Sequence, residues 1–365
     1  MMISSVFRQV GGDSELRRLI RAIGCWGFAA LVVLSLGTRL LAQDKKDKEK
    51  QVEDRTILSP GDGWPLKLTY YRSAGGKESP VVILLHMKGE SRLTWTAPNG
   101  FAEQLHGKGF AVIALDMRKH GQSKPGAEDD DPAKPAAKKS SPGSELKPID
   151  YPLMVRDLEG VKKLIFEEHQ NEKLNMRKTA IVAPTMSAAI AITFAAADWQ
   201  KAPYDDAANV ASRTPRGQDV QAMVFLSPET TLPGVPAHQV VSHLRGTPMS
   251  ALVMVGGADK EDKEQAKKLF QQLGGDPAKT EAPKKKAETK KGGKEAEKES
   301  EKASEKKGDE RLFYLPLKNV KLRGTDLLGK NLITEEAMSD FLSDHLKALK
   351  GPAYEWRDRQ SPLTK

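Results

Sequence analysis

The fold is decided by the stretch Phe101-Ala-Glu-Gln-Leu-His-Gly-Lys-Gly-Phe-Ala-Val-Ile-Ala-Leu-Asp-Met-Arg-Lys-His-Gly-Gln-Ser123. Its first part, 101–106, suits a helix, and Phe110–Leu115 is a continuous apolar run of strand length. Such a run is typical of a strand that is buried on both faces of a parallel sheet.

The same alternation of apolar runs and amphipathic segments continues on both sides of this stretch. A turn and an edge hairpin are expected at 60–72. Further buried strands are predicted at 80–86, 179–183, 220–226, 248–255 and 312–315, and helices at 151–169, 186–197, 260–273 and 335–349. Strands that alternate with helices on this scale predict an α/β fold with a mostly parallel central sheet and helices on both faces.

The amino-terminal segment has the order of a secretory signal. A basic region at Arg17, Arg18 and Arg21 precedes an apolar run from Ala22 to Thr38. That run is short for a membrane span, which needs about 20 apolar residues. We therefore expect 1–43 to be a signal peptide, with an uncleaved membrane anchor as the alternative, and we expect the protein to be periplasmic or secreted.

Composition divides the rest of the chain. We expect a charged linker at 44–57, one folded domain at 58–350 and a carboxy-terminal tail at 351–365. Two polar stretches inside the domain, at 124–147 and 276–310, cannot bury enough apolar area to fold and are predicted to be disordered. The formal charge is +9, but 276–310 carries 11 Lys against 10 acidic residues, so we expect no nucleic-acid partner.

Cys25 is the only cysteine and lies inside the predicted signal. The mature chain would then have neither disulfides nor thiol chemistry, and a large apolar core must hold the fold together. No histidine pair has the spacing of a zinc site, so we read His86 and His120 as loop-shaping residues. The sequence predicts no cofactor and no metal.

Several landmarks together resemble the α/β-hydrolase superfamily of esterase-like and lipase-like serine hydrolases, over roughly 58–350. One is His86-Met-Lys-Gly-Glu-Ser91 after a buried strand, and another is the 101–123 stretch with its Asp-x-Arg-x-His-Gly-x-Ser turn. The segments 224–228, 252–259 and 323–328 follow in the order that the family shows. The loop at 227–247 is too short for the large lid domain of many lipases.

The resemblance places the catalytic serine of the family on Thr185. In the family a Gly-x-Ser-x-Gly elbow joins a strand to a helix, whereas this chain has Ala183-Pro-Thr-Met-Ser187. A β-branched residue is poorly suited to the positive φ of such an elbow. Either the turn relaxes here or Thr185 is strained. The alternative is that Thr185 has no catalytic role and only caps the following helix.

The other triad positions are Asp259 for the acid and Arg323 for the base, because Arg323-Gly-Thr-Asp326 stands where relatives carry His-Gly-Thr-Asp. An arginine stays protonated and cannot accept the proton of a nucleophile. We hypothesise an ion pair between Asp259 and Arg323, with helix capping as a second role for Asp259. His345, the only histidine downstream, should lie inside the last helix.

By the same resemblance the oxyanion donors would be the backbone N–H groups of Met87 and Met186. The sequence therefore predicts an exported, esterase-like fold with an impaired triad and a binding or structural role. Its ligand would be a small molecule with a carbonyl or carboxylate group. Two alternatives stay open: an active hydrolase of small esters or peptides that uses Thr185, and a cell-envelope interaction protein that acts through its charged segments. Any membrane contact would run through the amino-terminal segment if that segment is not cleaved, and the sequence does not indicate which protein partner the chain has.

Overall fold

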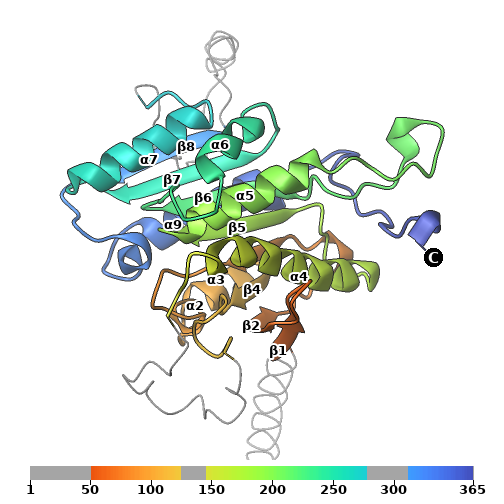
Figure 1. Cartoon of the computed structure of the whole chain (residues 1–365), viewed down its shortest axis with the longest axis horizontal. Helices are drawn as coiled ribbons and strands as arrows, with labels where there is room; N and C mark the ends of the chain where they lie inside the picture. The colour runs from red at the N-terminus through yellow and green to blue at the C-terminus, as the bar shows by residue number, and fades with distance from the viewer. Residues whose placement is uncertain (1–50, 125–144, 278–310, 365) are drawn as a thin grey trace, which may run out of the picture. The chain divides into compact units, whose positions relative to one another are not determined.

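The computed structural model describes residues 51–124, 145–277 and 311–364, and these build one eight-stranded sheet (Figure 1). The strand order is β1-β2-β4-β3-β5-β6-β7-β8. The strands are β1 Val52–Leu58, β2 Pro65–Tyr71, β3 Val81–Leu84, β4 Ala111–Leu115, β5 Thr179–Pro184, β6 Val220–Leu226, β7 Ser250–Gly256 and β8 Leu312–Leu317. The predicted elements of the sheet are all present.

The strands from β4 to β8 run parallel, and β2 and β1 add an antiparallel hairpin at one edge. β3 and β4 show why these strands are apolar throughout. Val81 and Ile83 face one core cluster, and Val82 and Leu84 face the other. Each strand therefore needs apolar residues at odd and even positions alike, which explains the continuous runs in the sequence.

Helices cover both faces of this sheet. One face is packed by α4 (Asp150–Gln170), α5 (Ser187–Gln200), α6 (Ala237–Val240) and α7 (Lys260–Gln272), of which α4 and α5 lie in front of the sheet in Figure 1. The other face is packed by α2 (Leu93–Thr96), α3 (Phe101–Gly107) and α9 (Thr334–Leu342). The last predicted helix changes to a π-helical turn at Ser343–Lys347.

Two predicted boundaries are wrong. The charged linker was expected to run to residue 57, but Val52–Leu58 pairs with β2 over its whole length. Its charged residues Glu53, Asp54 and Arg55 suit an exposed edge strand, and Arg55 also binds Glu168 on α4. The carboxy-terminal tail is likewise part of the fold, because Arg359 and Ser361 are buried.

The predicted signal segment 1–43 and most of the two polar insertions lie outside the described residues. In the described ranges no helix is long and apolar enough to cross a membrane.

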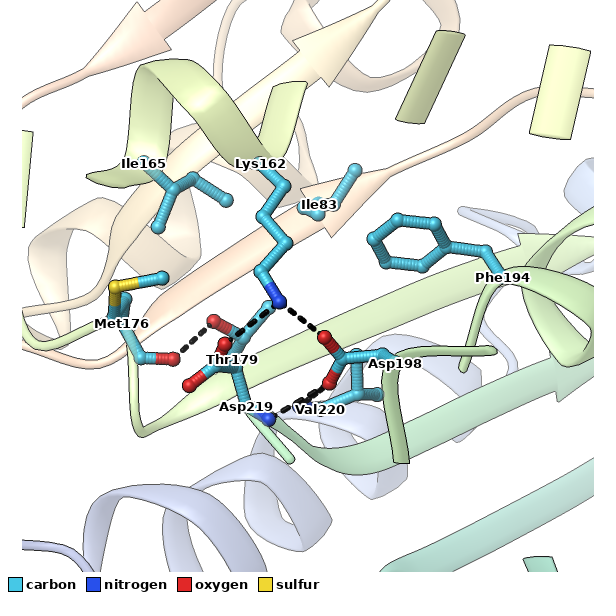
Figure 2. A pocket seen from close by; sticks show the side chains of 9 residues that line it. All are labelled: Ile83, Lys162, Ile165, Met176, Thr179, Phe194, Asp198, Asp219 and Val220. Carbon is cyan, nitrogen blue, oxygen red and sulfur yellow. Dashed lines mark hydrogen bonds and ion pairs between the residues drawn. The ribbon is translucent and has the colours of Figure 1, made fainter. Parts of the chain in front are cut away.

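A buried charge cluster connects α4, α5 and the start of β6 (Figure 2). The ammonium group of Lys162 lies between the carboxylates of Asp198 and Asp219, and the latter distance is 2.8 Å. Asp198 is fully buried and also accepts the backbone N–H of Asp219 at 2.7 Å. The pKa of Lys162 is raised because the two carboxylates outweigh the effect of burial. Removing one partner of such a buried pair typically costs about 3–5 kcal/mol.

Candidate functional site

The turn between β5 and α5 holds Thr185 in a left-handed backbone conformation with φ 44°. Hydrogen bonds fix it on both sides. Its N–H donates to Leu226 O at 2.9 Å, and its carbonyl accepts the N–H groups of Ala188 at 3.1 Å and Glu229 at 3.0 Å. Of the two possibilities that the sequence left open, the chain therefore adopts the strained turn, which costs about 1–3 kcal/mol.

The loop after β8 packs closely against this turn at Gly324, the residue that follows Arg323. Gly324 also has a positive φ, 54°, and a Cβ added to it would lie 2.8 Å from the Thr185 methyl group and 2.2 Å from Met87 Sδ. Its N–H donates to Ser227 Oγ at 3.1 Å. The structure thus brings the predicted positions at Thr185, Met87 and the 323–326 loop together at the carboxyl edge of the sheet.

The Arg323 side chain is engaged elsewhere. Its guanidinium group lies 2.8 Å from Glu229 and 2.9 Å from Asp262. Burial raises the pKa of the Asp262 carboxyl although Arg323 opposes the shift. The hypothesised ion pair between Arg323 and Asp259 is not among the contacts of the described residues. It was wrong because Glu229 and Asp262 are nearer, and neither was considered from the sequence.

Asp259 is exposed and caps α7, where its carboxylate accepts the N–H of Asp262 at 3.0 Å. The capping role suggested for it is therefore the one it has.

The Thr185 side chain is 6% exposed, and its hydroxyl makes no hydrogen bond within the described parts of the chain. All seven histidines lie in those parts. His345 stacks on Phe341 and approaches Ser250, the first residue of β7, so it lies at the opposite edge of the sheet.

His86 directly precedes Met87 in the sequence, and its ring connects the loop at Met87 with the loop at Met117. It is completely buried; its Nδ1 bonds Met87 O at 2.8 Å and its Nε2 accepts Met117 N–H at 3.0 Å. Burial and the adjacent His120 lower the pKa of His86 to about 3, so the ring is neutral at physiological pH. His86 shapes the loop, as the sequence suggested.

The two oxyanion-equivalent positions differ. In the described residues the Met186 N–H, at the start of α5, has no hydrogen-bond partner, and Met186 is 3% exposed. The Met87 N–H instead donates to Glu90 Oε2 at 3.2 Å. The other oxygen of Glu90 accepts the hydroxyl of Thr325 at 2.7 Å. A carboxylate of the chain itself therefore occupies one of the two donors.

Sequence reasoning missed Glu90, Thr325 and Glu229 as members of this site. Glu90 lies in the quoted 86–91 segment, and a carboxylate three residues after a loop donor was the available signal. Thr325 and Glu229 carry no local signal, because only the meeting of three strand ends brings them to Thr185. No group of residues in the described ranges is arranged to hold a metal ion.

No family model matches the chain and no curated protein does. Among solved structures, the chain is similar to an esterase of Rhizomucor miehei. The two share 15% sequence identity with a TM-score of 0.50, over 81% of this chain and 83% of the esterase chain. Dienelactone hydrolase of Anabaena variabilis gives 17% identity and a TM-score of 0.48, over 81% and 99%.

The sheet order, the strand-to-helix elbow and the likeness to the Rhizomucor miehei esterase agree: the chain has the α/β-hydrolase fold. At such low identity the likeness establishes the fold, and function has to be argued from the site.

The backbone at Thr185 gives a stability prediction. At φ 44° a glycine is unstrained, whereas an alanine keeps its Cβ in the unfavourable region. We expect Thr185→Gly to be more stable than Thr185→Ala by about 1 kcal/mol, the reverse of the usual order. Urea unfolding of both variants measures this, and an alanine variant that is equal or more stable would contradict the left-handed turn.

Proposed function

We propose that this chain is an exported esterase-like protein that has lost serine-hydrolase chemistry and acts by binding a small carbonyl or carboxylate compound. The observation that carries the proposal is the environment of the Thr185 hydroxyl, which has no hydrogen-bonded base among the described residues. A hydroxyl needs such a base to lose its proton and become a nucleophile.

The charged groups around the elbow support the same proposal. Arg323, at the position of the base, is held by Glu229 and Asp262, so it is neither able to accept a proton nor free to move toward Thr185. Asp259, at the position of the acid, caps a helix. Each triad position therefore has a role in the fold that does not require catalysis.

What remains is a half-formed anion site. The Met186 N–H at the start of α5, which has no hydrogen-bond partner among the described residues, favours a carbonyl or carboxylate oxygen, helped by the helix dipole. Glu90 competes for the second donor. A ligand with a carboxylate must displace Glu90 from Met87, whereas a neutral carbonyl compound avoids the repulsion between two carboxylates.

The purified chain should not react with a fluorophosphonate probe more than Thr185→Ala does, and its hydrolysis of an aryl acetate should not exceed that of the same variant. The physical reason is that loss of triad members lowers turnover by about 10⁴-fold to 10⁶-fold. Gel fluorescence and absorbance measure both quantities, with an active serine hydrolase treated in parallel. Labelling that Thr185→Ala abolishes would instead establish the active-hydrolase alternative.

The binding role predicts an effect at Glu90. Glu90→Gln removes the competing negative charge, so we expect butyrate to bind about tenfold more tightly, which corresponds to about 1.4 kcal/mol. Chemical-shift titration of the Met186 and Met87 amides measures this affinity. Glu78→Gln, at an exposed glutamate elsewhere, makes the same change of net charge and should have no effect. Unchanged or weaker binding in Glu90→Gln would count against the site.

Export is part of the proposal and is supported by the basic region and the apolar run of the first 43 residues. An exported chain should begin near residue 43 when its mature form is weighed by mass spectrometry. A mature chain that still carries 1–43 at the membrane would favour the anchor, and one that stays in the cytoplasm would refute export.

A further inference from the structure

A cavity of about 180 Å³ lies at the end of the sheet opposite Thr185. It is bounded by residues that precede or begin β5, β6 and β7, namely Arg177, Gln221 and Pro248, and by the carboxy-terminal segment with Tyr354 and Arg359. A single buried water needs only about 10–15 Å³. The cavity beside Lys162, at about 10 Å³, holds at most one water, whereas this one has room for a small organic molecule.

The wall of the cavity carries a surplus of positive charge. Arg177 donates to the carbonyl groups of Pro352 and Glu355, at 3.2 Å each, and in the described chain it forms no ion pair. Burial, together with the nearby Arg359 and Arg357, lowers the pKa of Arg177 to about 10. Arg359 is paired with Asp219, but Lys162 shares that carboxylate. An anion would relieve the repulsion.

Two residues that line the cavity each have a buried polar side-chain atom with no hydrogen-bond partner in the described chain. The atoms are Nε of Arg359, a donor, and Oε1 of Gln221, an acceptor, and the two residues are 4% and 5% exposed. An unpaired buried polar group costs about 1–3 kcal/mol, so such atoms in a cavity wall indicate a ligand that pairs with them. A ligand that pairs with both atoms needs one oxygen acceptor and one hydrogen-bond donor.

The remaining walls distinguish an organic molecule from a simple ion. Trp199, Pro215 and Pro248 present apolar surface, and the Trp199 ring nitrogen is already bonded to Val220 O at 2.8 Å. Apolar walls with a few convergent polar groups are typical of sites for small organic ligands. A hydrated inorganic ion gains little from them.

We propose that this cavity binds a small carboxylate that carries a hydroxyl group, with Arg177 and Arg359 at the carboxylate and Gln221 accepting the hydroxyl. The site is separate from the Thr185 elbow and does not depend on the function proposed for it. The two arginines recognise the negative charge of the ligand, and the Gln221 side-chain oxygen accepts its hydroxyl.

Malate and succinate differ by one hydroxyl and test the proposal by calorimetric titration of the full chain. Malate should bind at least tenfold more tightly than succinate, and inorganic phosphate should bind more weakly than either. Arg177→Gln should lower the affinity for malate at least tenfold. Arg216→Gln, at an exposed neighbour with the same change of charge, should leave the affinity unchanged.

Gln221→Leu provides a second variant, because it removes the unpartnered acceptor and keeps both arginines. It should abolish the preference for malate while succinate still binds. Thermal unfolding of each variant verifies that the carboxy-terminal segment stays in place. The absence of saturable binding, equal affinities for malate and succinate, or a preference for phosphate would overturn the proposal, and Glu90→Gln should not alter these results.

Discussion

The constraint on which the site depends is the left-handed backbone at the end of β5. Three hydrogen bonds, to Leu226, Ala188 and Glu229, hold Thr185 there, although its β-branched side chain disfavours that conformation. The apolar contacts of the surrounding sheet offset the free-energy cost of this strain. α5 begins directly after this turn, at Ser187, with Met186 as its N-cap residue.

The strained turn also determines what its neighbours must be. Gly324 has to lack a side chain because Thr185 and Met87 fill the space beside it. Once that loop is packed against the elbow, Thr325 meets Glu90, and the Arg323 side chain extends past Thr185 to Glu229 and Asp262. The charged groups around the elbow are thereby paired with one another or with hydrogen-bond donors of the chain.

Much of the fold was predictable from the sequence because strands buried on both faces leave continuous apolar runs, as at 110–115 and 220–226. The edge strand β1 was not, since its outer edge is exposed and its sequence, Val-Glu-Asp-Arg, resembles the charged linker before it. The positions of Thr185 and Met87 followed from the resemblance. The partners of Arg323 did not, because Glu229 and Asp262 are distant in sequence and meet it only where β6, β7 and β8 end together.

The two edges of the sheet differ in how their charges are balanced. At the carboxyl edge, Arg323 has two carboxylates and Glu90 has two donors, so a ligand must compete with bonds that already exist. At the opposite edge, Lys162 and Arg359 share Asp219, and within the described residues Arg177 has carbonyl groups as its hydrogen-bond partners and forms no ion pair. A charge whose partners are only neutral dipoles gains more from an incoming anion than one that is already paired. On electrostatic grounds the opposite edge is therefore the better place for this chain to hold an anionic ligand, even though the fold places its elbow at the other.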